Sequence, residues 1–139
     1  MKKSEKVLLV EDDRELLKTL KEHLKGAGFK TRFAATGAEA LKLAATAGEL
    51  DLLITDVLLP DLNGIELAKK LLARQPGLKV AFMSGYLRPS LADPDTPDAA
   101  PTPFIQKPFS GKTLTGFIRQ CLRGDEAEAP DQAALRLQE

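Results

Sequence analysis

The chain has 139 residues, a formal net charge of zero at pH 7 and a composition ordinary for a soluble globular protein. This length predicts one domain with a substantial hydrophobic core, and the charge balance gives no indication of a nucleic-acid-binding or membrane-binding surface. No apolar run approaches the roughly 20 residues of a membrane-spanning helix. The single cysteine, Cys121, excludes an intrachain disulfide and favours a reducing, cytoplasmic location.

The N-terminal part of the chain predicts a buried strand followed by an amphipathic helix. The strand is the continuous apolar run 7–10, and three acidic residues follow it. The leucines of the helix recur at helical spacing and form one apolar stripe: Leu16, Leu17, Leu20 and Leu24. Asp12, with Glu15 three residues further on, predicts a capping box at the start of this helix.

Two more strand–helix pairs follow. A strand is expected over 29–35, and Thr36 then predicts the N-cap of a helix that ends near Gly48. A buried strand is predicted over 52–56, where it ends in an aspartate. A loop leads from it to a helix that Asn63 caps.

The C-terminal part predicts two further strands and one well-patterned helix. The strands are expected over 79–83 and 104–106. The segment 87–103 between them contains five prolines, too many for a full helix, so we expect a long loop with at most one helical turn. Ser110 predicts the cap of the last helix, whose apolar face carries Leu114, Phe117, Ile118, Cys121 and Leu122.

Alternation of strand and helix over the whole chain predicts an α/β domain with a parallel sheet and helices on both faces. Right-handed crossovers favour the flavodoxin-like order 2-1-3-4-5, with the fourth helix short or replaced by the Pro-rich loop. We expect this domain to cover residues 1–124 and to be followed by a polar, flexible tail over 125–139.

Polar residues follow four of the five predicted strands, and the carboxyl ends of parallel strands share one edge of a sheet. Carboxylates this close need compensation, and Mg²⁺ prefers carboxylates together with water and phosphate oxygens. We therefore predict a metal-assisted site at which Asp56 attacks phosphorus and becomes an acyl phosphate, with Lys107 as its cationic partner. The residues at the strand ends are Glu11, Asp12, Asp13, Asp56, Ser84 and Lys107.

Four motifs, in order and at the expected strand ends, carry a resemblance to a known family. The chain resembles the receiver domain of bacterial two-component response regulators across roughly 6–124. The residues around Ser84 and Lys107 look most like those of receivers attached to hybrid histidine kinases. The motifs are Val10-Glu11-Asp12-Asp13, Thr55-Asp56 followed by Pro60 and Asn63-Gly64, Met83-Ser84-Gly85-Tyr86, and Gln106-Lys107-Pro108-Phe109.

The resemblance implies a phosphoacceptor mechanism. Asp56 would be phosphorylated by a phosphohistidine on a sensor histidine kinase or a histidine phosphotransfer protein. Mg²⁺ (or Mn²⁺) would be ligated by Asp13, Asp56 and the backbone carbonyl of Leu58, with Asp12 acting through water. Beyond taking up and slowly losing its own phosphoryl group, the domain would not be an enzyme.

The resemblance also assigns roles around the acceptor. Ser84 and Lys107 would bind the phosphoryl group, and Ser84 would move with Phe104, which stands at the family's aromatic switch position. Leu58 and Tyr86 occupy positions that tune access and phosphoryl lifetime. Phe104 has no hydroxyl, so a switch there would act by packing alone, and static core packing is an equal reading.

Other functions remain open at this point. One is a phosphorylation-independent docking module on the same fold, which would bind partners equally well without the Asp56 carboxylate. Another is an enzyme; a flavin site is disfavoured by the acids after the first strand, and an aspartyl phosphatase by Leu58 where a second aspartate would stand. Direct DNA binding is not expected. The cognate kinase, the oligomeric state and whether the chain is free-standing or part of a hybrid kinase are not indicated.

Overall fold

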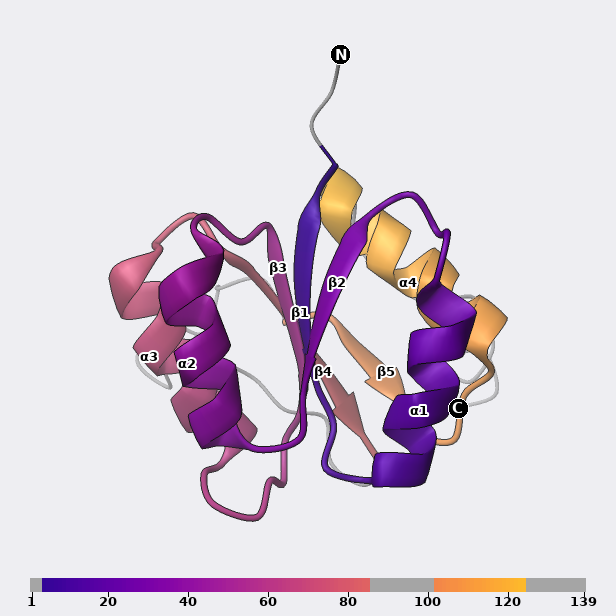
Figure 1. Ribbon diagram of the computed structural model, residues 1–139, viewed down its shortest axis with the longest axis horizontal. Helices are drawn as coiled ribbons and strands as arrows, with labels where there is room; N and C mark the ends of the chain where they lie inside the picture. The colour runs from indigo at the N-terminus through magenta and orange to yellow at the C-terminus, as the bar shows by residue number, and fades with distance from the viewer. Residues whose placement is uncertain (1–3, 86–101, 125–139) are drawn as a thin grey trace.

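The computed structural model describes residues 4–85 and 102–124, which form a five-stranded sheet and four helices (Figure 1). The strands are β1 (Lys6–Val10), β2 (Lys30–Ala34), β3 (Leu52–Asp56), β4 (Lys79–Ser84) and β5 (Phe104–Gln106). The helices are α1 (Arg14–Leu24), α2 (Gly37–Ala47), α3 (Gly64–Arg74) and α4 (Gly111–Arg123).

All five strands are parallel and lie in the order β2-β1-β3-β4-β5, which confirms the predicted flavodoxin-like topology. The register aligns the strand ends: Val10 is opposite Thr55, and Asp56 is opposite Met83. Ser84 in turn is opposite Gln106, the residue before Lys107. The carboxyl ends of β1, β3, β4 and β5 therefore lie side by side at one edge of the sheet.

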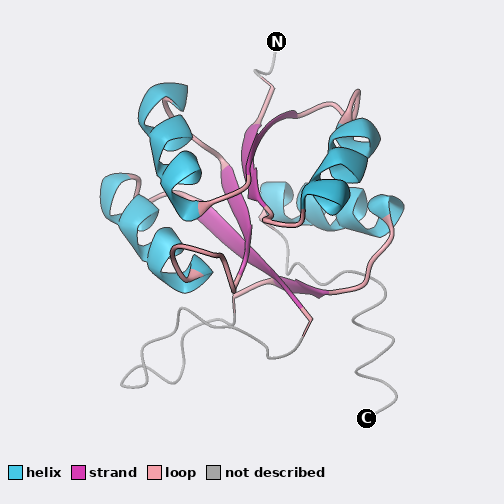
Figure 2. Ribbon diagram, turned by 60° about the horizontal axis from the view of Figure 1, so that its bottom comes forward, coloured by secondary structure: helices cyan, strands magenta, loops and turns pink. Residues whose placement is uncertain are grey.

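The helices form two layers, with α1 and α4 on one face of the sheet and α2 and α3 on the other (Figures 1 and 2). Successive residues of β1 alternate between two apolar clusters, with Leu9 facing the α1/α4 layer and Leu8 facing the α2/α3 layer. The inner strands β1, β3 and β4 contribute residues to both clusters and are covered on both faces, as their continuous apolar runs predict. The predicted apolar face of the last helix is confirmed, because all its members are buried: Leu114, Phe117, Ile118, Cys121 and Leu122.

The observed helix caps agree with the predicted ones at three helices and differ at the fourth. Thr36, Asn63 and Ser110 cap α2, α3 and α4 through their side-chain oxygens, as predicted. The predicted cap of α1 was wrong by one residue, because Asp13 and not Asp12 occupies the N-cap. Its Oδ1 accepts hydrogen bonds from the N–H groups of Glu15 and Leu16, at 3.0 and 3.1 Å.

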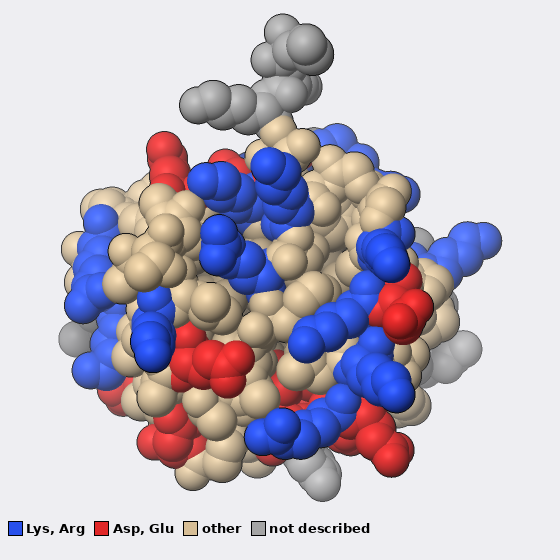
Figure 3. Space-filling view, in the orientation of Figure 1, with Lys and Arg blue, Asp and Glu red and all other residues tan. Residues whose placement is uncertain are grey.

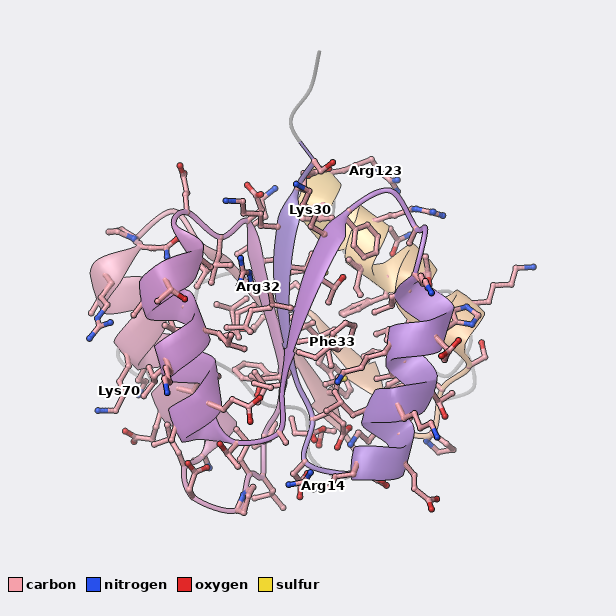
Figure 4. All side chains as sticks on the ribbon, in the orientation of Figure 1. Arg14, Lys30, Arg32, Phe33, Lys70 and Arg123 are labelled. Atoms are coloured by element: carbon pink, nitrogen blue, oxygen red, sulfur yellow. The ribbon has the colours of Figure 1, made fainter. Side chains whose placement is uncertain are left out.

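Basic side chains are scattered over the face of the molecule seen in Figure 1, among uncharged and acidic ones. In the space-filling view Lys and Arg spread across this face, and they include Lys30 and Arg32 of the edge strand β2 (Figures 3 and 4). Arg32 lies on the opposite side of β2 from Phe33, which packs against the α1/α4 layer (Figure 4). Charged side chains on an edge strand oppose its pairing with another strand.

Most of the Pro-rich loop predicted over 87–103 lies outside the described residues, as does the predicted tail over 125–139. The prediction that the helix between the fourth and fifth strands is short or replaced by this loop concerns the same residues and lies outside the described part of the chain. None of the helices within the described residues is long and apolar enough to span a membrane.

Candidate functional site

Asp56 is the last residue of the fully buried strand β3, and only 4% of its surface is exposed. A loop over 57–63 follows it, and the Gly64 N–H closes the base of this loop by donating to the carbonyl oxygen of Val57 at 2.7 Å. A Cβ at Gly64 would overlap the carbonyl oxygen of Asp56, so only glycine permits this approach of the two backbones. The sequence thus fixes Asp56 at the sheet edge by burying the strand before it and folding the loop tightly behind it.

Lys107 connects two buried carboxylates at this edge. Its Nζ lies 2.6 Å from Glu11 Oε1 and 2.6 Å from Asp56 Oδ1. The Lys107 N–H also donates to the carbonyl oxygen of Ser84 at 2.8 Å, so the chain after β5 is tied to the end of β4. Glu11 has no exposed surface, and its Oε2 accepts a hydrogen bond from the Asp13 N–H at 2.9 Å.

Three carboxylates gather at the same place. Glu11, Asp12 and Asp56 each offer an oxygen, and these oxygens all lie within 4.8 Å of one another. The second carboxylate oxygen of Asp56, Oδ2, is buried and has no hydrogen-bond partner. Hard divalent cations take carboxylate oxygens as ligands, and an unpartnered buried oxygen is costly without such a ligand. The residues present therefore fit Mg²⁺ or a cation of the same class.

The electrostatics of the site reflect the conflict between burial and charge. Burial and the nearby Glu11 carboxylate raise the pKa of Asp56 to about 8, although Lys107 acts in the opposite direction. Burial alone would also raise the pKa of Glu11, but hydrogen bonds with Asp56 and Lys107 outweigh it and hold that pKa below its ordinary value. Burial alone would lower the pKa of Lys107, yet the two carboxylates raise it. Without a cation, burial and the nearby Glu11 carboxylate therefore favour the protonated form of Asp56.

A pocket of about 360 Å³ opens over these groups. The predicted site residues Asp12, Asp56, Leu58, Ser84 and Lys107 all line it, and the other lining residues are Val57, Met83 and Gly85. The pocket therefore brings together acidic, hydroxyl and ammonium groups from the ends of four strands. Tyr86, predicted to tune access to it, lies outside the described residues.

The structure places Asp13 differently from the sequence prediction. Asp13 was predicted as a direct metal ligand, but its side chain caps α1 and is not among the three grouped carboxylates. Glu11, absent from the predicted ligand set, takes its place in the group. The Glu11 N–H donates to the carbonyl oxygen of Ala34 at 3.0 Å, so Glu11 continues the path of β1 and is buried with it.

Phe104, the predicted switch residue, is half-buried at the start of β5. It packs against the apolar cluster of the α2/α3 layer. This position agrees with a packing role, and a switching role for Phe104 stays a prediction.

The comparisons with known proteins agree with this geometry. The family model described as the response regulator receiver domain matches residues 7–119. The chain belongs to this family. Receiver domains with its fold have been solved: one from Methanospirillum hungatei is 28% identical with a TM-score of 0.71, and covers 88% of this chain and 96% of its own. The receiver domain of the hybrid histidine kinase CckA is 33% identical with a TM-score of 0.69, over 84% of this chain and 98% of its own.

Two curated relatives from Brucella abortus differ in how much of their own length the match covers. The sensor kinase CckA is 34% identical over 84% of this chain, but the match spans only 12% of CckA. The receiver protein CpdR is 31% identical over 84% of this chain, and the match spans 96% of CpdR. This receiver domain therefore resembles both a small part of a kinase and nearly the whole of a single-domain protein.

Proposed function

We propose that this receiver domain is a phosphoacceptor switch of a two-component phosphorelay. The observation that carries the proposal is the Asp56 carboxylate, which lines the pocket with one oxygen on Lys107 and the other without a partner. Its phosphodonor is a phosphohistidine of a sensor histidine kinase or of a histidine phosphotransfer protein. The lone cysteine fits action in the cytoplasm.

The chemistry is a transfer between two nucleophiles. A carboxylate oxygen of Asp56 forms a bond to phosphorus while the phosphorus–nitrogen bond of the donor breaks, and its electron pair returns to the departing imidazole. Lys107 and the hydroxyl of Ser84 hold the transferred oxygens. Later hydrolysis of the acyl phosphate returns the carboxylate, so the domain turns over no substrate other than its own phosphoryl group.

A divalent cation would be held by the carboxylates of Glu11, Asp12 and Asp56, together with the backbone carbonyl of Leu58. This set differs from the predicted one because Glu11, and not Asp13, offers an oxygen within 4.8 Å of oxygens of Asp12 and Asp56. The predicted direct contact of Asp13 with the cation stays a prediction. When bound, Mg²⁺ or Mn²⁺ supplies positive charge that favours the ionised form of Asp56 and offsets its repulsion of the phosphoryl oxygens.

The test is an amide chemical-shift titration of the protein with Mg²⁺ and beryllofluoride, a stable mimic of the phosphoryl group. We expect shifts around Asp56, Ser84 and Lys107, and none of the beryllofluoride-dependent shifts in Asp56→Asn. A wild-type protein whose amides do not respond would contradict the proposal. So would equal binding of a partner kinase by wild type and Asp56→Asn under phosphorylating conditions, which would indicate a docking module.

A further inference from the structure

The loop between β3 and α3 is tied to the start of α2 by a single side chain. The two carboxylate oxygens of Asp61 accept hydrogen bonds from the N–H groups of Gly37 and Ala38, each at 2.9 Å. These partners are more than 20 residues away in sequence, at the end of α2 where the helix dipole is positive. The hydrogen bonds from Ala38 and Gly37 hold the pKa of Asp61 below its ordinary value. Asp61 is therefore a charged bridge between two separate elements.

The contact between the loop and α2 extends beyond this bridge. Gly37 lies directly against the loop, because a Cβ at this position would stand 2.8 Å from the Cβ of Leu62. Figure 1 shows the loop at the lower edge of the molecule, beside the first turn of α2. The base of the loop is closed where Gly64 meets the backbone of Asp56 and donates to the carbonyl oxygen of Val57. The loop is thus anchored on both sides.

Leu58 lines the pocket, and in the chain it lies between Val57, whose carbonyl oxygen accepts a hydrogen bond from the Gly64 N–H, and Asp61, which binds the start of α2. The side chain of Leu58 is 67% exposed, so burial of that side chain does little to set the position of its backbone. The chain is tied on either side of Leu58 instead, at Val57 by the Gly64 N–H and at Asp61 by the start of α2. A backbone carbonyl can ligate a hard cation only while it is held near the other ligands. If the loop holds the carbonyl there for only a fraction of the time, the apparent affinity for the cation falls by that fraction.

We propose that Asp61 is a positioning residue for the cation site: its bridge to the N-terminus of α2 holds the Leu58 backbone beside the acidic group. This inference rests on the proposed function, because it concerns the same cation. It predicts that loss of the bridge weakens cation binding and leaves the chemistry of a fully loaded site largely unchanged.

The experiment compares Asp61→Ala with Thr36→Ala. Thr36 caps α2 through the Glu39 N–H at 3.1 Å, and it is not part of the loop. Both variants lose a cap of α2, but only Asp61→Ala loses the bridge. Glu39→Gln, in the same first turn, removes one negative charge without either change and serves as the charge control.

Three quantities are measured on each protein: the dissociation constant for Mg²⁺ by calorimetry, the urea midpoint of unfolding, and the rate of phosphoryl uptake from acetyl phosphate at saturating Mg²⁺. We expect Asp61→Ala to weaken Mg²⁺ binding roughly tenfold, the usual size of an effect from a residue that supports a metal ligand. Its uptake rate at saturating Mg²⁺ should stay within about twofold of wild type. Thr36→Ala should lower the urea midpoint and leave Mg²⁺ binding unchanged.

The inference is overturned if Asp61→Ala binds Mg²⁺ as wild type does, or if Asp61→Ala, Thr36→Ala and Glu39→Gln weaken binding equally. A wild-type protein that binds no Mg²⁺ would instead overturn the proposed function, and the inference with it. Should Asp61→Ala fail to fold, Asp61→Asn decides, since the amide oxygen can accept one of the two hydrogen bonds. We expect Asp61→Asn to lie between wild type and a tenfold loss.

Discussion

At the scale of single residues, the site depends on one buried acid that is held close to another. Glu11 and Asp56 are both almost fully buried, and one ammonium group, Lys107, compensates them at 2.6 Å from each. One positive charge cannot balance two ionised carboxylates, and the pKa of Asp56 is raised accordingly. A bound divalent cation would add positive charge and favour the ionised form of Asp56.

The raised pKa of Asp56 makes the stability of the metal-free protein depend on pH. Between its ordinary value of 3.8 and the folded value of about 8, the folded state holds a proton that the unfolded state releases. The contribution of Asp56 is fully present below this window and is lost as the pH rises through it. In the presence of a chelator, Asp56→Asn should therefore gain stability relative to wild type across the window, by at most about 1.4 kcal/mol per pH unit.

This comparison is made by urea unfolding of both proteins in EDTA. Glu11 and Lys107 are present in both, so the difference between the two free energies of unfolding reports mainly on Asp56. A difference that does not change with pH would mean that Asp56 is ionised in the folded, metal-free protein.

The close approach at Gly64 gives a second prediction at this scale. In Gly64→Ala the new methyl group would overlap the carbonyl oxygen of Asp56, so the backbone must shift, at a cost of about 1–3 kcal/mol. Gly77→Ala is the matched control, because nothing lies within 4 Å of its Cβ position. The free energy of unfolding from urea melts measures both. Equal effects of the two substitutions would show that the turn after Asp56 is not tightly packed.

At the scale of elements, local rules predicted the helices and most of their caps, because Thr36, Asn63 and Ser110 bond to N–H groups within three residues. The same rules misplaced the start of α1. Glu11, Asp12 and Asp13 are adjacent acids, and which of them reach the pocket depends on where the strand ends and the helix begins. A shift of one residue moved Asp13 out of the acidic group and Glu11 into it. The continuous burial of β1 was the signal that could have placed Glu11.

The bridge from Asp61 could not be predicted from the sequence by any local rule. Its partners, Gly37 and Ala38, precede it by more than 20 residues and belong to another element. Capping motifs concern residues within one turn of a helix start, and long-range caps become visible only when the chain is folded.

The packing of the last helix, α4, against the sheet can be tested through its buried cysteine. Cys121 on its apolar face is 5% exposed, and burial raises its pKa to about 12, with Lys79 acting weakly against this. Alkylation of the thiol should be at least about a hundredfold slower in the folded protein than in urea, since the thiolate is the reactive form. Mass spectrometry over time measures both rates. Comparable rates would mean that α4 leaves the sheet readily.

At the scale of the whole molecule, strand–helix alternation was sufficient to predict the topology, because right-handed crossovers leave few ways to arrange five parallel strands. The order of strands then decides which distant residues meet. Asp56 and Lys107 are separated by 51 positions in the chain (107 − 56), yet their side chains are 2.6 Å apart, because the ends of β3, β4 and β5 share one edge. The sequence motifs could be assembled into one site only because this order was predicted correctly.

Mass spectrometry tests most directly whether Asp56 accepts a phosphoryl group, as we propose. The protein is incubated with acetyl phosphate in Mg²⁺ or in EDTA, and Asp56→Asn is treated in the same way. We expect one added phosphoryl group that hydroxylamine removes, on the peptide containing Asp56, and only in wild type with Mg²⁺. An adduct that persists in Asp56→Asn, or wild-type protein that stays unmodified in Mg²⁺, would contradict the proposal.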